Sequence, residues 1–205
     1  MGSYLNPSTK GFQESLSSKI YVDKSMLIDK LNALVNTKQK FICVSRPRRF
    51  GKSMAADMLS AYYGNDSDTT ALFGSLKIAQ ADSYRKHLNK YHVIKINIQE
   101  FLSATHDVDE MLNALQKRVL IDLKRVYPEI VDGNQLIWAM MDIFAATNRP
   151  FVILIDEWDC LFREFAHNTE AQKKYLDFLR AWLKDQDYDE TGRKSHESQR
   201  NVTGN

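Results

Sequence analysis

The chain has 205 residues, of which 43% are hydrophobic and 11% aromatic, which is enough apolar material for one domain with a core of its own. Its net charge of +2 removes any overall electrostatic case for nucleic acid or a membrane surface as a partner. No apolar run reaches the roughly 18 residues of a membrane-spanning helix, and the N-terminus lacks the apolar region of a signal peptide.

The first part of the chain predicts one helix and one strand. Residues 1–20 are polar and indicate an irregular lead-in. Apolar residues at helical spacing predict a helix over Met26–Asn36, and we expect Asp23 or Ser25 to cap it. The β-prone run Phe41–Ser45 then predicts the first strand of a sheet.

The residues after this strand have the features of a phosphate-binding loop. A turn of proline and arginines leads into Gly51, Lys52 and Ser53, and a helix is expected over Lys52–Tyr63, ended by Gly64. A loop that runs into a helix N-terminus points its backbone N–H groups at phosphate. The glycine permits close approach, the lysine would contact the β- and γ-phosphates, and the serine hydroxyl would bind Mg²⁺.

This loop departs from the general pattern G-x-x-x-x-G-K-[ST] because Arg46 stands where the first glycine is expected. Gly-Lys-Ser alone is a common tripeptide, so the prediction needs support from elsewhere in the chain. Arg48 and Arg49 are weaker candidates for phosphate contact, with solvated loop arginines as the alternative. Phe50 and Met54 complete the expected nucleotide-contact set.

Helices and one further strand are predicted downstream. The strand is His92–Ile98, and the helices are Thr69–Phe73, Ala81–Asn89, Asp107–Tyr127, Asn134–Thr147 and Thr169–Lys184. Residues 187–205 contain almost no apolar side chains and predict a disordered tail. The chain thus divides into one domain over residues 1–186 and this tail.

A second motif supports the phosphate-binding loop. Phe151–Ile155 reads as a strand buried on both faces, and Asp156 and Glu157 follow it at the end of the strand where open α/β sheets bind ligands. Asp156 is placed to hold Mg²⁺, directly or through water, and Glu157 to orient and deprotonate an attacking water. An acidic turn after a core strand is the alternative. With Gly51-Lys52-Ser53 upstream, the two motifs together predict nucleotide binding.

Three neighbouring residues have simpler expected roles. Trp158 is expected to pack rather than stack on adenine, and Asp159 to cap a helix. Cys160 and the distant Cys43 lie in or beside strand-like segments and are expected to be buried, reduced thiols. Reduced thiols are typical of the cytoplasm, which is therefore the expected location.

The chain resembles the AAA-ATPase-like proteins, which are often fused to a PD-(D/E)XK nuclease domain. The resemblance runs from about residue 4 to about residue 186, and the Arg46 that departs from the general motif is normal for this family. The matching stretches are Tyr21–Ser25, Ser45–Ser53, Asn97–Leu102, Leu154–Cys160 and Tyr175–Leu183.

The resemblance implies an α/β, RecA-like P-loop fold, a three-layer sandwich with a mostly parallel sheet. It also implies ATP and Mg²⁺ as cofactors, with Lys52 and Glu157 in catalysis and Ser53 and Asp156 at the metal. The sensor-1 strand that the family inserts between its two motif strands is missing. The chain is therefore expected to be an N-terminal part or the product of a disrupted reading frame.

The missing strand leaves two structural alternatives and two functional ones. Phe41–Ser45 and Phe151–Ile155 either pair directly or leave a sheet edge exposed. The chain either hydrolyses ATP or is a regulatory module that binds nucleotide with little turnover. AAA-type assembly leaves a homo-oligomer or a protein partner open, whereas nucleic acid would need a basic stripe interleaved with aromatic residues, which the sequence lacks.

Overall fold

The computed structural model describes residues 2–44 and 51–184, apart from the side chain of Lys184. The predicted tail at 187–205 and the loop residues 45–50 lie outside the described residues. The described chain forms two compact units, the first over residues 1–98 and 149–158 and the second over the remainder. The division of the sequence into one domain and a tail stays a prediction.

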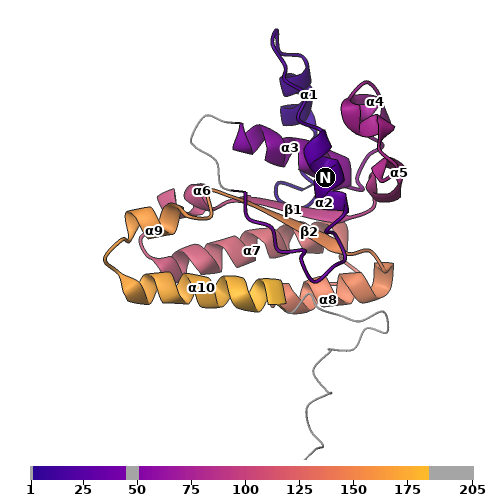
Figure 1. Cartoon of the computed structure of the whole chain (residues 1–205). Coiled ribbons are helices and arrows are strands. Elements are labelled where there is room, and N and C mark those ends of the chain that lie inside the picture. The colour runs from indigo at the N-terminus through magenta and orange to yellow at the C-terminus, as the bar shows by residue number, and fades with distance from the viewer. Residues whose placement is uncertain (1, 45–50, 185–205) are drawn as a thin grey trace, which may run out of the picture. The chain divides into compact units, whose positions relative to one another are not determined.

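The first unit contains two strands and the N-terminal helices, which Figure 1 shows on the same side of the strands. Helix α3 packs against both strands. The elements are α1 (Lys10–Leu16), α2 (Met26–Asn32), α3 (Lys52–Tyr63), α4 (Thr70–Phe73), the 3-10 helix η1 (Lys77–Gln80), α5 (Tyr84–His87), β1 (His92–Asn97) and β2 (Phe151–Asp156).

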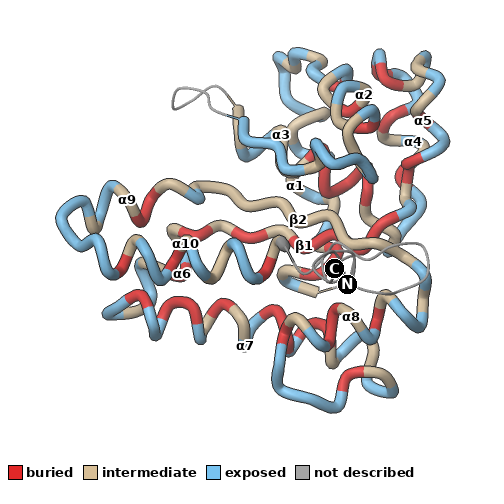
Figure 2. The backbone as a smooth tube through the Cα atoms, turned by 60° about the horizontal axis from the view of Figure 1, so that its bottom comes forward, coloured by how far each residue is buried: buried red, intermediate tan, exposed pale blue. Residues whose placement is uncertain are grey.

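The two strands form a parallel pair whose register runs from His92 opposite Phe151 to Asn97 opposite Asp156. Most of β1 is buried and all of β2 is half-buried, as the red and tan tubes of Figure 2 show. This parallel sheet and the helices around it confirm the predicted α/β class. The larger RecA-like sandwich stays a prediction.

The predicted strand Phe41–Ser45 is wrong for the residues that are described. Residues 41–44 adopt no regular structure, and Phe41, Ile42 and Val44 are 56%, 42% and 47% exposed. Among the described residues, β2 pairs with β1 alone, so the two motif strands do not pair with each other. An extended segment becomes a strand only when another strand takes up its backbone N–H and C=O groups, and no described segment does so here.

The C-terminal half of α3 lies at the centre of the first unit. Its residues 58–63 are all buried, and the predicted bounds of this helix are confirmed. The hydroxyl of Tyr63 donates to Asn32 at 2.8 Å, the amide of Asn32 donates to the Tyr62 hydroxyl at 3.0 Å, and Tyr62 donates to the carbonyl of Tyr84 at 2.6 Å. This buried chain of hydrogen bonds ties α3 to α2 and α5.

The expected irregular lead-in contains a helix, α1. Phe12 is buried and stacks on Phe73 at 5.0 Å between ring centroids. A Cβ built at Gly11 would lie 3.0 Å from an oxygen of Asp57, which forms an ion pair with Lys95 of β1. Tertiary contacts therefore fix a helix that the polar sequence does not predict.

The second unit is helical. It contains α7 (Val108–Val126), α8 (Leu136–Thr147), α9 (Cys160–Glu164), α10 (Thr169–Lys184) and most of α6 (Ile98–Ser103). Helices α7 and α10 lie side by side, and Lys174 of α10 pairs with Asp109 of α7 at 2.6 Å. The buried Trp182 donates to the sulfur of Met140 at 3.3 Å. The long helices match their predictions to within two residues.

The bounds of the shorter helices were predicted less accurately. Helix α2 ends at Asn32 rather than Asn36, and only Tyr84–His87 of the expected helix Ala81–Asn89 is helical. Helix α5 ends where Leu88 becomes extended, and Asn36 and Asn89, which lie beyond the two helices, have left-handed backbones with φ of 65° and 55°. None of the helices in the described ranges is both long and apolar enough to cross a membrane.

Candidate functional site

The N-terminus of α3 forms one half of the candidate site. Gly51 occupies the N-cap position with a left-handed backbone, φ 76° and ψ 36°, which glycine adopts without the strain that a side chain would add. Lys52 and Ser53 form the start of the helix, where backbone N–H groups have no partner within the helix. The sequence therefore places a cation and a hydroxyl at the positive end of the helix dipole.

The carboxyl end of β2 forms the other half. Ser53 Oγ donates to Asp156 Oδ2 at 2.7 Å, although the two residues are 103 positions apart in the sequence. The packing of α3 against β2 produces this contact, because the helix starts at the edge where β2 ends. The two motifs that the sequence singled out are thus one site in the first unit.

Glu157 follows Asp156 with an unusual backbone. Its φ of 50° is left-handed, which costs a residue with a side chain about 1–2 kcal/mol. The same turn lets the Glu157 N–H donate to Asp156 Oδ1 at 3.0 Å. Strained backbones concentrate at functional sites, so this outlier is a further reason to look for function here.

Ser53 and Asp156 fit the requirements of Mg²⁺. This ion binds oxygen atoms at 2.0–2.1 Å in an octahedron, which puts neighbouring ligands about 2.9 Å apart, close to the 2.7 Å between these two side chains. Mg²⁺ is usually held by one or two protein oxygens together with the phosphates of a substrate. Within residues 2–44 and 51–184 no group of three or more His, Cys, Asp or Glu could hold a metal.

The other residues that the sequence analysis singled out differ in whether the structure describes them and in how exposed they are. Arg48, Arg49 and Phe50 lie outside the described residues, so their contacts stay predictions. Met54, in the first turn of α3, is 45% exposed. Trp158 is 39% exposed at the end of the first unit. Asp159 takes the N-cap position of α9, but its carboxylate binds Arg163 instead of the helix backbone.

The two cysteines differ in burial. Cys160 is buried as expected, but Cys43 is exposed, so the expectation was wrong for Cys43. Its burial depended on the predicted strand at Phe41–Ser45, which residues 41–44 do not form.

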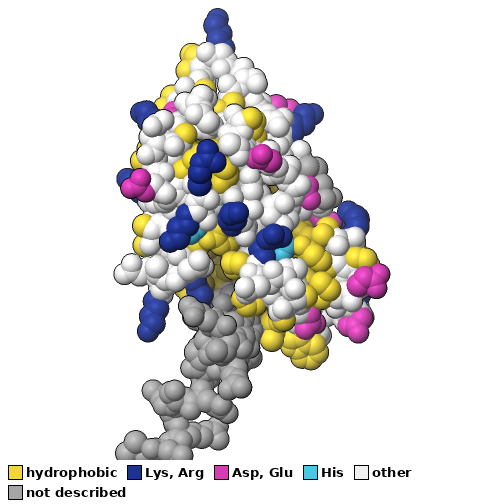
Figure 3. All heavy atoms as spheres, turned by 90° about the vertical axis from the view of Figure 1, so that its right-hand side faces the viewer, with side chains coloured by type: hydrophobic (Ala, Val, Ile, Leu, Met, Phe, Trp, Pro, Cys, Tyr) yellow, Lys and Arg dark blue, Asp and Glu magenta, His cyan; other side chains and the backbone are white. Residues whose placement is uncertain are grey.

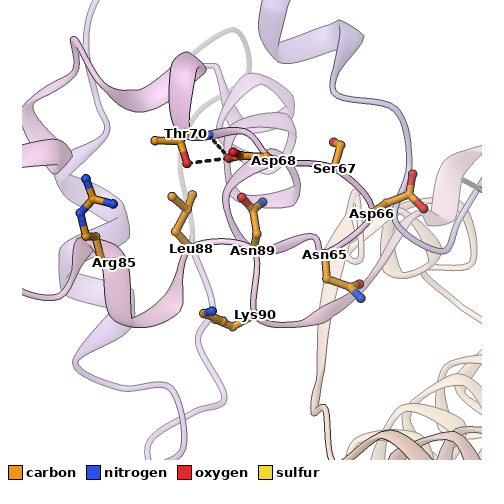
Figure 4. A pocket seen from close by; sticks show the side chains of 9 residues that line it. All are labelled: Asn65, Asp66, Ser67, Asp68, Thr70, Arg85, Leu88, Asn89 and Lys90. Carbon is orange, nitrogen blue, oxygen red and sulfur yellow. Dashed lines mark hydrogen bonds between the residues drawn. The ribbon is translucent and has the colours of Figure 1, made fainter.

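A separate hollow of the first unit is lined by none of the predicted site residues. Figure 4 shows Asp68 accepting two hydrogen bonds from Thr70, with Asn89 and Arg85 among the other residues that line the hollow. Asn89 donates to the Gly64 carbonyl at 2.6 Å and accepts from the Thr69 N–H at 3.1 Å. These contacts fix the loop after α3 against the loop after α5. The hollow therefore lies between two packed loops.

Comparison with known proteins identifies a family. A family described as Predicted AAA-ATPase matches residues 10–191. The chain belongs to the AAA-ATPase-like family. No curated protein and no solved structure matches it. For this AAA-ATPase-like chain, family membership supports a general ATPase-like function that uses nucleotide.

The surface drawn in Figure 3 bears on one expectation about partners. On that face Lys and Arg side chains are interspersed with Asp, Glu and hydrophobic ones. The expectations about nucleic acid, a homo-oligomer and a protein partner all stay predictions.

Proposed function

We propose that this chain binds ATP with Mg²⁺ at the junction of α3 and β2 and hydrolyses it. The observation that carries the proposal is the 2.7 Å hydrogen bond between Ser53 and Asp156, which unites the two sequence motifs. Family membership supports the same function. A RecA-like P-loop sandwich is the fold that we propose for this domain.

Each residue has a distinct part in this proposal. The N–H groups at the start of α3 and the ammonium of Lys52 bind the phosphates, since anions are stabilised at a helix N-terminus. Ser53 and Asp156 would hold Mg²⁺, and the ion would neutralise charge on the phosphates. Glu157 orients and deprotonates the attacking water.

Nucleotide titration tests the binding step. Lys52→Ala should abolish binding of a fluorescent ATP analogue whether or not Mg²⁺ is present, because the phosphates lose a charged contact. Ser53→Ala should weaken binding at least tenfold with Mg²⁺ and little in EDTA, because it loses a metal ligand.

Ser60→Ala is the matched control for Ser53→Ala. Ser60 lies on the same helix, and its buried hydroxyl finds no hydrogen-bond partner among the described residues. Its removal should leave binding unchanged. Equal loss of binding in both serine variants, or full binding by Lys52→Ala, would contradict the proposal.

Phosphate release tests the hydrolysis step. Glu157→Gln should bind ATP like the parent and release phosphate at least about 100-fold more slowly, the usual scale of a lost general base. A parent that binds Mg²⁺ and ATP but releases no phosphate would make the chain a nucleotide-binding module without turnover.

A further inference from the structure

A second lysine lies at the N-terminus of α3. A Cβ atom built at Gly51 would be 3.5 Å from the Nζ of Lys24, so this ammonium approaches the backbone at the helix start. Lys24 belongs to the segment Asp23-Lys24-Ser25 that precedes α2. It is therefore distant in sequence from the residues that the phosphate-binding motif identifies.

The two neighbours of Lys24 hold it in place. Asp23 accepts from the backbone N–H of Lys77 and from that of Ser25, both at 2.8 Å. The fully buried Ser25 accepts from the N–H of Ile78 at 3.1 Å. The segment is therefore bound on both sides of Lys24 to the backbone of η1.

Asp23 is ionised at neutral pH, which strengthens the hydrogen bonds that it accepts from the backbone of Ser25 and Lys77. Partial burial raises the pKa of its carboxyl group, but the hydrogen bonds from Ser25 and Lys77 outweigh burial and hold the pKa below its ordinary value. Asp23 is thus ionised at neutral pH and a strong acceptor. The exposed Lys24 side chain extends from a fixed backbone toward Gly51.

Two cations and one carboxylate lie at the start of α3. The first turn of the helix contains no acidic residue, Lys52 and Lys24 lie at its positive end, and Asp156 reaches it from β2 through the hydrogen bond with Ser53. A helix N-terminus stabilises an anion. A polyphosphate bound there would be attracted by both ammonium groups, next to a Mg²⁺ ion that Asp156 would hold.

We propose that Lys24 is a second phosphate-binding cation of the nucleotide site, supplied by the clamped segment Asp23–Ser25. This inference rests on the proposed function, because it concerns the same phosphates that Lys52 binds. The ligand chemistry is that of a polyphosphate, and contact with the base is not involved. The inference gives the side chains of Asp23 and Ser25 a positioning role.

Direct calorimetric titration with inorganic tripolyphosphate tests the inference, because this probe has phosphates but no base. With Mg²⁺ present, Lys24→Ala should bind tripolyphosphate about tenfold more weakly than the parent, the scale of one lost charge-assisted contact. Lys24→Arg should retain most of the affinity. Lys19→Ala, which removes an exposed lysine near the same segment, should match the parent.

Thermal unfolding without ligand separates binding from structure. Lys24→Ala should unfold within a few degrees of the parent, because the Lys24 side chain is exposed and lies outside the core. A lower unfolding temperature that accounts for the weaker binding would overturn the inference.

The outcomes also separate the two proposals. If Lys52→Ala loses tripolyphosphate while Lys24→Ala binds it like the parent, the role of Lys24 is overturned and the nucleotide site remains. If the parent binds neither tripolyphosphate nor ATP, both proposals are overturned.

Discussion

Two apolar runs of similar composition have different fates in this molecule. Phe41-Ile42-Cys43-Val44 and Phe151-Val152-Ile153-Leu154 both precede a proposed site motif. The second is strand β2, paired with β1 along its whole length. The first is exposed and irregular. The difference shows that an apolar, β-prone sequence is not sufficient for a strand, because a strand also needs a neighbouring strand to pair with.

The largest expected effect is on the free energy of unfolding, when an aspartate is introduced into each of the two runs. Leu154→Asp should lower the free energy of unfolding by about 3–4 kcal/mol, because Leu154 packs against the core of the first unit. Ile42→Asp should change it by less than about 0.5 kcal/mol, since this side chain is 42% exposed. Denaturant unfolding of both variants measures the difference. A similar loss in both would mean that residues 41–44 are packed in solution.

A pH-dependent effect of intermediate size concerns the partner of β2. His92 begins β1, is fully buried and lies opposite Phe151. Burial, with the nearby Arg149 charge, lowers the pKa of His92 to about 4, whereas an unfolded histidine titrates near 6.5. The unfolded chain therefore binds more protons between these values. Stability should fall as pH drops from about 6.5 to 4, by up to about 3 kcal/mol.

Denaturant unfolding at a series of pH values measures this dependence. His92→Gln should flatten the profile between pH 4 and 6.5, while His106→Gln, at an exposed position, should leave it like that of the parent. A parent and a His92→Gln variant with parallel profiles would show that the pairing of β1 with β2 does not depend on a neutral His92.

The smallest expected effect is one of reactivity. Cys43, in the unpaired run, is exposed, whereas Cys160 is buried. In the native state a thiol reagent should modify Cys160→Ser rapidly at its remaining Cys43, and Cys43→Ser slowly at Cys160. After denaturation both thiols are accessible, so the two variants should then react at similar rates. This measurement is the control. Slow labelling of Cys43 would indicate that its segment is covered.

Local sequence was enough to predict several elements. Helix α3 begins and ends as expected, because Gly51 and Gly64 flank a continuous helical run. The existence of strand β2 was predicted correctly from its unbroken apolar run, but its expected burial on both faces was wrong, because every residue of β2 is only half-buried and β1 is its one neighbour among the described strands. Ser53 and Asp156 were assigned to one metal site because each belongs to a recognisable motif, and the structure brings their side chains within 2.7 Å, whereas the metal itself stays a prediction.

Features that depend on distant contacts were missed. Helix α1 needs Phe73 to cover Phe12, and residues 41–44 need a strand that no described residue supplies. Either Asp23 or Ser25 was expected to cap α2, but Ser25 makes no side-chain cap and both residues bind the backbone of η1. Their real contacts, and with them the position of Lys24, follow from folding and cannot be found in the local pattern.

The uneven burial of α3 affects how the site can move. Residues 58–63 of this helix are buried, whereas Ser53 and Met54 at its start are exposed. Backbone amides in the first turn should therefore exchange with solvent through small local openings, and those near Tyr62 only through global unfolding. A ligand at the first turn would stabilise that turn selectively, so the site can tighten without any rearrangement of the core.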